Sequence, residues 1–278
     1  MIKLAAIDLD GTLFDPDQKI TPVNKQAIRK AIDSGIKVAI VTGRGRIGAE
    51  RALDQLGMDL PYICSAGALA REGRQGAALY AHAFHRPKEI AHLLAFARLS
   101  GAGLITDTPE DISYWFGPDA MEELVDPATA ADTRQSLRSR DPERDFDRPL
   151  LKMTIVAEAD VLLQAEKLVR EKCPSIHQTY SGLKYIDLTG QGVNKGTALK
   201  ALAELWKLRS GEVAAIGDQA IDVFMLKYAG LPIAMGNAVD ELKRAAKWIA
   251  PGNDQDGVAW ALEKMIEQNK GEKEKGSE

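Results

Sequence analysis

Two carboxylates stand two residues apart near the start of the 278-residue chain, directly after a short apolar segment. Residues 4–7 predict a buried strand, and Asp8 and Asp10 follow it, with Gly11 and Thr12 close behind. Because residues i and i+2 of an extended strand share a face, we expect both carboxylates to point the same way. Such like charges raise each other's pKa unless a cation lies between them, and a hard divalent ion such as Mg2+ prefers oxygen ligands. An ordinary Asp-Gly turn is the alternative that these residues alone leave open.

A second polar signal follows the next predicted strand, residues 36–41. Thr42 and Gly43 stand at its end, where a hydroxyl and the following backbone N–H groups can bind phosphate oxygens. A helix predicted from Thr21 onwards separates the two strands. This order predicts a βαβ unit with parallel strands, which places Thr42 at the same edge of the sheet as Asp8.

The second half of the chain repeats the pattern of polar residues at the ends of predicted elements. Lys195 precedes a helix predicted at 197–208, although cations prefer helix C-termini, so an anion bound there would explain its position. Asp218 ends another predicted strand, and Asp222 follows one helical turn later. Asn237 lies in a loop after a further predicted strand and is a candidate for contact with the site.

The order of these signals resembles the four motifs of the haloacid dehalogenase superfamily. The layout resembles its Cof-like subgroup, which is type IIB and carries a C2 cap. Asp8-Leu9-Asp10-Gly11-Thr12 is similar to motif I, Thr42 to motif II, Lys195 to motif III, and the pair Asp218 and Asp222 to motif IV.

The resemblance implies a role for each of these residues. Asp8 would be the nucleophile that takes a phosphoryl group, and Asp10 the general acid and base. Lys195 would bind the phosphoryl group and steady the nucleophile, while Asp222 would pair with Lys195 or lie behind the metal ligands. Phosphate contacts are expected from Thr42, Gly43, Lys195 and Asn237, and Mg2+ ligands are expected from Asp8, Asp218 and the backbone carbonyl of Asp10.

Two residues depart from the family's usual polar lining. Ala66 and Ile221 stand where many Cof-like relatives carry Asn. Neither side chain can donate or accept a hydrogen bond. We therefore expect weaker activity on generic small phosphates and a larger contribution of the cap to substrate binding.

The predicted elements indicate an α/β protein with a Rossmann-like, doubly wound parallel sheet. Residues 1–83 and 189–268 supply the core domain. In residues 84–188 the predicted helices and strands no longer alternate as they do in the core, and this part is predicted to form an inserted α/β cap. The resemblance implies a cap of the C2 type. Residues 269–278 are rich in Lys, Glu and Gly, and are predicted to form a flexible tail.

Bulk composition narrows the function classes. The formal charge is −4 and the pI is about 5.7, so there is no global basic footprint for nucleic acid. Neither a signal peptide nor an apolar run of membrane length is recognised, and Cys64 and Cys173 have no metal-type spacing. We expect a cytoplasmic protein without a membrane partner; the sequence does not indicate its oligomeric state.

These signals together predict a Mg2+-dependent phosphatase. It would hydrolyse a small phosphorylated metabolite, with a sugar phosphate favoured, through an aspartyl-phosphate on Asp8. Two alternatives stay open: a phosphomutase that uses the same intermediate, and a protein that binds phosphorylated ligands without turnover.

Overall fold

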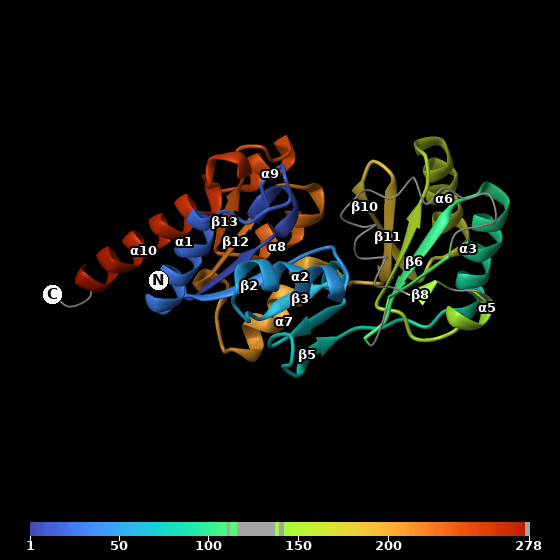
Figure 1. Cartoon of the computed structure of the whole chain (residues 1–278), viewed down its shortest axis with the longest axis horizontal. Coiled ribbons are helices and arrows are strands. Elements are labelled where there is room, and N and C mark those ends of the chain that lie inside the picture. The colour runs from blue at the N-terminus through green and yellow to red at the C-terminus, as the bar shows by residue number, and fades with distance from the viewer. Residues whose placement is uncertain (110–111, 116–136, 139–141, 276–278) are drawn as a thin grey trace.

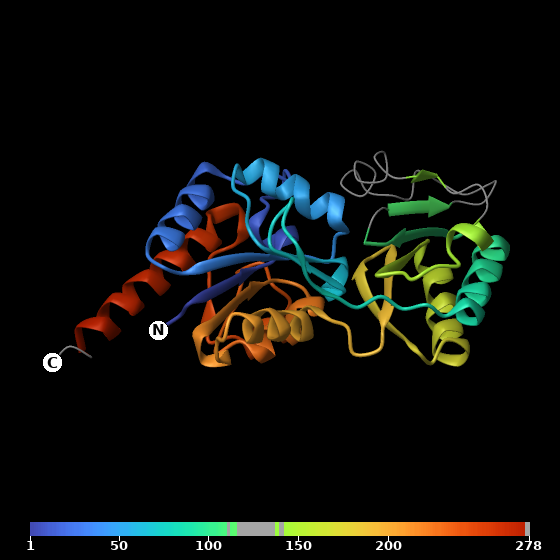
Figure 2. The ribbon, with the colours of Figure 1, turned by 90° about the horizontal axis from the view of Figure 1, so that it is seen from below.

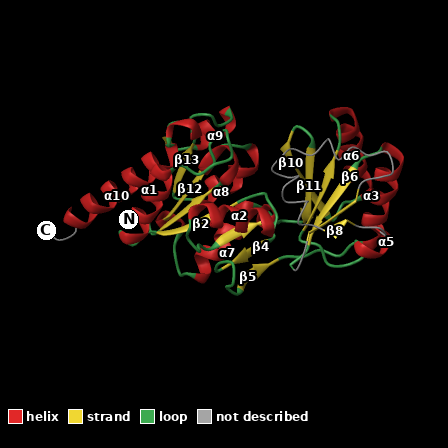
Figure 3. Cartoon of the chain, viewed as in Figure 1, coloured by secondary structure: helices red, strands yellow, loops and turns green. Residues whose placement is uncertain are grey.

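The computed structural model describes residues 1–109, 112–115, 137–138 and 142–275, and the strands form two separate sheets (Figures 1 and 3). The larger sheet has eight strands in the order β14-β13-β12-β1-β2-β3-β4-β5. The first six of that order pair in parallel, and an antiparallel hairpin of β4 and β5 extends the edge. Their bounds are β1 (Leu4–Ile7), β2 (Lys37–Val41), β3 (Tyr62–Cys64), β4 (Leu69–Arg71), β5 (Ala78–Ala81), β12 (Val213–Gly217), β13 (Leu231–Ala234) and β14 (Trp248–Ile249).

Helices cover both faces of this sheet, so its central strands are buried on both sides (Figure 2). The helices α1, α2 and α10 lie on one face, and α7 and α8 on the other. The first helix begins as the sequence predicts, because Thr21 caps it by accepting a hydrogen bond from the Asn24 N–H at 3.1 Å. Bounds are α1 (Pro22–Asp33), α2 (Arg46–Leu56), α7 (Lys195–Leu205), α8 (Val223–Tyr228), α9 (Asp240–Ala245) and α10 (Gly257–Lys275).

The smaller sheet has six strands in the order β10-β11-β9-β6-β7-β8 and is antiparallel except where β7 meets β8. Two long helices, α3 and α6, lie on the side of this sheet away from the larger one (Figure 1). Bounds are α3 (Pro87–Ser100), β6 (Gly103–Asp107), β7 (Ile112–Trp115), β8 (Leu137–Arg138), α5 (Pro142–Asp145), β9 (Lys152–Val156), α6 (Ala159–Lys172), β10 (Ile176–Gly182) and β11 (Tyr185–Gly190).

Each sheet has its own buried apolar cluster. Because separate cores are the mark of separate domains, we propose the division expected from the sequence, with 1–83 and 189–268 as core and 84–188 as cap. Side chains alternate across a strand, so Met153 and Ile155 of β9 pack in the cap's core, and Lys152 and Thr154 lie on the opposite face. That second face is the one turned toward the larger sheet.

Two features differ from the sequence-based expectation. The hairpin of β4 and β5 was not expected. The last helix continues to Lys275, although residues 269–278 were predicted to form a flexible tail. Within this helix the Asn269 side chain accepts from the Ile2 N–H and donates to the Ile2 carbonyl, both at 2.7 Å, which ties the helix to the segment before β1. A brief helix predicted at 119–124 lies outside the described residues.

Among the described residues, no helix combines the length and the apolar character that a membrane crossing requires. The predicted cytoplasmic location stays a prediction.

Candidate active site

Four of the predicted residues meet at the carboxyl edge of the larger sheet. Asp8 follows β1, Thr42 follows β2 and Asp218 follows β12, while Lys195 opens α7. All four are at most 4% exposed. Strand β1 lies between β2 and β12, so the sheet is extended by β2 and β3 on one side of β1 and by β12 and β13 on the other. Open α/β sheets bind their ligands at such a switch in strand order, beyond the carboxyl ends of the strands.

A buried lysine joins two of the carboxylates. The Lys195 Nζ donates to Asp8 Oδ1 and to Asp222 Oδ1, both at 2.6 Å. Asn194 positions this lysine by capping α7, since its side chain accepts from the Thr197 N–H at 2.9 Å. Burial opposes the charge of Lys195, but Asp222 and Asp8 outweigh it and raise its pKa above the ordinary value. The lysine is therefore a fixed cation beside Asp8.

Three carboxylates form a group that could hold a metal ion. Ligand atoms of Asp8, Asp218 and Asp222 all lie within 4.8 Å of one another. Asp222 is already engaged, because one oxygen accepts from Lys195 and the other from the Asp218 and Gln219 N–H groups at 3.0 Å. Asp218 is engaged as well, since its oxygens accept from Thr12 Oγ1 at 2.8 Å and from Gln219 Nε2 at 2.9 Å. Asp8 and Asp218 stay the predicted metal ligands, and Asp222 holds the lysine in place.

The electrostatics of this group fit a divalent cation. Burial, followed by the charge of Asp222, raises the pKa of Asp8 well above its ordinary value and that of Asp218 to about 6. One lysine among three buried carboxylates leaves excess negative charge, and carboxylate oxygens are the ligands that Mg2+ prefers. A cation bound here would relieve the repulsion that raises both pKa values.

Asp10 does not share a strand face with Asp8, which corrects the sequence-based expectation. The strand ends at Ile7 and the chain turns through residues 9–13, with Gly11 at φ 75°. The Asp10 carboxylate faces Arg44 instead, accepting from its Nε at 2.8 Å and from a terminal nitrogen at 2.5 Å. The predicted acid and base is therefore held by a planar, two-point contact.

The predicted phosphate contacts divide into two groups. Thr42 is fully buried, and its Oγ1 accepts from the Arg44 N–H at 3.1 Å, which leaves its own hydrogen for another acceptor. Gly43 lies between them in the same turn. Asn237 is engaged elsewhere: its Nδ2 donates to the Gly11 carbonyl at 2.8 Å and its Oδ1 accepts from the Asn253 N–H at 3.0 Å. These bonds favour a role for Asn237 in fixing the loop after β1 over a phosphate contact.

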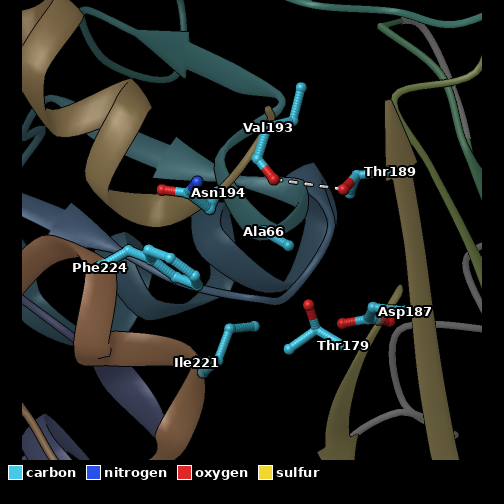
Figure 4. A pocket seen from close by; sticks show the side chains of 8 residues that line it. All are labelled: Ala66, Thr179, Asp187, Thr189, Val193, Asn194, Ile221 and Phe224. Carbon is cyan, nitrogen blue, oxygen red and sulfur yellow. Dashed lines mark hydrogen bonds between the residues drawn. The ribbon is translucent and has the colours of Figure 1, made fainter. Parts of the chain in front are cut away.

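Ala66 and Ile221 lie together in a small pocket between the cap and the core (Figure 4). The cap lines it with residues of β10 and β11, and the core lines it with the turn after β3 and with segments at the starts of α7 and α8. Figure 4 shows Thr179 and Asp187 on the cap side, opposite the side chains of Ala66 and Ile221. The lining residues are Ala66, Thr179, Asp187, Thr189, Val193, Asn194, Ile221 and Phe224. One wall is therefore apolar and the other carries oxygen atoms.

Sequence reasoning missed the charged residues that the cap places beside the site. Lys152, Asp107 and Asp187 are all at most 7% exposed and come from β9, β6 and β11. A usable signal was present, because each stands in or at the end of an apolar strand, and buried charges need partners. The partners themselves could not be assigned without the fold. Arg44, which follows Thr42 and Gly43, was likewise not predicted as a site residue.

The comparisons with known proteins agree with this geometry. The family profile of haloacid dehalogenase-like hydrolases matches residues 5–262. The 5-amino-6-(5-phospho-D-ribitylamino)uracil phosphatase YwtE of Bacillus subtilis is 30% identical over 297 residues, covering 95% of this chain and 98% of that protein. A haloacid dehalogenase-like hydrolase from Bacteroides thetaiotaomicron has a TM-score of 0.84 at 26% identity, covering 95% of this chain and all of that one.

A third similarity concerns the fold alone, since identity is only 22%. The HAD subclass IIB sugar phosphatase BT4131 matches with a TM-score of 0.81, covering 95% of this chain and 98% of that chain. The fold, with its parallel sheet and cap, and the phosphatases among the relatives identify the protein as an enzyme of the phosphomonoesterase class. The chain belongs to the haloacid dehalogenase-like hydrolases, and the resemblance seen in its sequence motifs is confirmed.

Proposed function

We propose that this phosphatase hydrolyses a small phosphorylated metabolite through an aspartyl-phosphate on Asp8. The observation that carries the proposal is the buried ion pair of Asp8 with Lys195, at the sheet edge where Thr42 also lies. The lysine opposes the burial that raises the pKa of Asp8, and it offers a positive charge to the incoming phosphoryl oxygens. A carboxylate in this environment can attack phosphorus.

In the first step an Asp8 oxygen forms a bond to phosphorus and the bond from phosphorus to the leaving oxygen breaks. Asp10 gives its proton to that leaving oxygen. In the second step Asp10 takes a proton from water, the water oxygen bonds to phosphorus, and the bond to Asp8 breaks to release inorganic phosphate. Thr42 donates its hydroxyl hydrogen to a phosphate oxygen in both steps. Arg44 orients Asp10 for the two proton transfers.

Mg2+ is the metal that suits the oxygen donors of Asp8 and Asp218, and when bound it would supply charge neutralisation between the nucleophile and the phosphate. Asp222 would keep Lys195 beside Asp8 while the metal is held. The Asp10 backbone carbonyl is proposed as a further ligand.

The pocket in Figure 4 is proposed to receive the leaving group. Its apolar wall of Ala66 and Ile221 suits carbon atoms, and the oxygen atoms of Thr179 and Asp187 suit hydroxyl groups, as in a sugar phosphate. Its volume is about 10 Å3, room for one water molecule. A leaving group of any larger size therefore requires the cap to move away from the core before binding.

The test is phosphate release from a panel of phosphorylated metabolites with Mg2+. We expect turnover of at least one sugar phosphate and none by Asp8→Asn, because an amide is a poor nucleophile. Wild-type activity in a contamination-free preparation of Asp8→Asn would exclude the covalent mechanism. A phosphomutase would instead give an isomerised sugar phosphate with little free phosphate. The organic product should therefore be identified, in addition to measuring the released phosphate.

A further inference from the structure

A buried ion triad lies on the face of the cap sheet that is turned toward the core. Lys152 Nζ is 3.3 Å from Asp187 Oδ1 and 3.8 Å from Asp107 Oδ2. Thr154, on the same face of β9, donates to Asp187 Oδ1 at 2.6 Å. Burial opposes the charge of Lys152, but the two carboxylates raise its pKa above the ordinary value. Lys152 is therefore a cation at neutral pH.

This triad makes hydrogen bonds to two loops of the core. Lys152 Nζ donates to the Gly43 carbonyl at 2.8 Å. Asp107 Oδ2 accepts from the Ser65 hydroxyl at 2.9 Å. The first bond reaches the turn that follows β2, and the second reaches the loop that follows β3. Lys152 thus contacts the turn that carries Thr42.

The contacted peptide group is fixed on both of its sides. Its carbonyl, from Gly43, accepts from Lys152, and its N–H, from Arg44, donates to Thr42 Oγ1 at 3.1 Å. That second bond sets the direction in which the Thr42 hydroxyl can donate. The Arg44 side chain, which leaves from the same peptide, holds Asp10 by two bonds. One peptide group therefore orients both a phosphate-binding hydroxyl and the partner of the acid and base.

We propose that Lys152 is a positioning residue that orders the turn Thr42–Arg44 from the cap. The proposal rests on the proposed function. Lys152 acts through the Gly43 carbonyl, which it fixes with a charge-assisted hydrogen bond. Since β9 belongs to the cap, the turn is fully ordered only while the cap is docked on the core. The cap thereby contributes to the chemistry at Asp8 as well as to the choice of substrate.

The test is a double-mutant cycle of Lys152→Met with Thr42→Val, read as kcat/KM for p-nitrophenyl phosphate with Mg2+. A lost bond to a charged group corresponds to a fall of about 10- to 100-fold, and we expect it mainly in kcat. If Lys152 acts through the turn, the double variant should lose much less than the product of the two single losses. Losses that multiply would overturn the proposal, since they would show that Lys152 acts independently of Thr42.

The matched control is Lys184→Met, which removes another cap lysine, whose Nζ pairs with the exposed Glu158 at 3.0 Å. Its kcat/KM should equal that of the wild type. If Lys152→Met alone does not fold, because two carboxylates are left without their cation, the cycle is run on the background Asp187→Asn, which removes one of those charges. An unchanged kcat in Lys152→Met that is folded would also overturn the proposal.

A second readout separates this proposal from the proposed function. Binding of inorganic phosphate with Mg2+ should raise the Tm of the wild type, and Lys152→Met should lose most of that rise while Lys184→Met keeps it. A wild type that releases no phosphate from any substrate contradicts the proposed function alone. A phosphate-induced rise in Tm that is equal in all three proteins contradicts the role of Lys152.

Discussion

At the residue scale, Asp10 and Asp8 have different partners, and this difference predicts different phenotypes. Asp10→Asn keeps the shape of the side chain but cannot exchange a proton, so kcat should fall at least about 100-fold. The Asp10 carboxylate is outside the acidic cluster, so the affinity for Mg2+ should be nearly unchanged. Both are measured by phosphate release over a series of Mg2+ concentrations. A variant with near wild-type kcat would remove Asp10 from the proton transfers.

Because the pKa of Asp218 is raised, we expect the stability of the protein to depend on pH and on Mg2+. Its pKa is raised to about 6 by burial and by Asp222, so in the metal-free protein its protonated form stabilises the fold below its ordinary pKa. This contribution is lost as the pH rises through about 6. Mg2+ binds the ionised form, so the rise in Tm that Mg2+ produces should be larger at about pH 7.5 than at about pH 5.

The measurement is thermal unfolding with and without excess Mg2+ at the two pH values. Asp218→Asn is the control, since the amide does not titrate and is a weaker ligand, and it should show a small Mg2+ effect at both. An equal rise in the wild type at the two pH values would contradict the prediction.

At the element scale, the short turn after β3 contains a strained alanine. Ala66 has φ 56° and ψ 24°, a left-handed conformation that costs an L-residue about 1–2 kcal/mol. Ala66→Gly should relieve this strain and stabilise the protein by up to about 1 kcal/mol after the added chain entropy of glycine. The nearby Ala68 has φ −78°, so Ala68→Gly should destabilise by about 0.5–1 kcal/mol or more.

Urea unfolding of the two variants compares the same substitution at neighbouring buried positions. The free energy of unfolding should be higher for Ala66→Gly than for the wild type, and lower for Ala68→Gly. The reverse order would show that the loop relaxes to another conformation.

At the scale of the whole molecule, the last helix holds the N-terminal end of the chain. Asn269 makes two hydrogen bonds to Ile2, and the amino group of Met1 pairs with Glu272 at 2.5 Å. Asn269→Ala should lower the free energy of unfolding by about 1–3 kcal/mol, since it also leaves the Ile2 backbone groups short of partners. The neighbouring exposed Lys270→Ala should change it by less than about 0.5 kcal/mol. Equal effects in urea unfolding would indicate that the end of α10 does not hold the N-terminus.

The sequence by itself determined the strands that carry the site and the order of the polar residues at their ends. Strand β1 begins and ends where the apolar run of residues 4–7 does, and Thr21 caps α1 as predicted. These features are local: periodicity, capping and strand length depend on near neighbours in the chain. The parallel arrangement of β1, β2 and β12 then follows from connection rules, and it places Asp8, Thr42 and Asp218 at one edge.

The motif resemblance implies that Lys195 lies beside Asp8 and Asp222, and the structure shows both contacts, but only the tertiary structure decided the other charge contacts. Asp8 and Asp10 are two residues apart, but one pairs with Lys195 and the other with Arg44, because the chain turns immediately after β1. Asn269 was predicted to lie in a flexible tail, but it bonds to Ile2, 267 positions away. Lys152 reaches Gly43 across the interface of two sheets. Such contacts depend on how separately folded layers dock, and no pattern of neighbouring residues encodes that geometry.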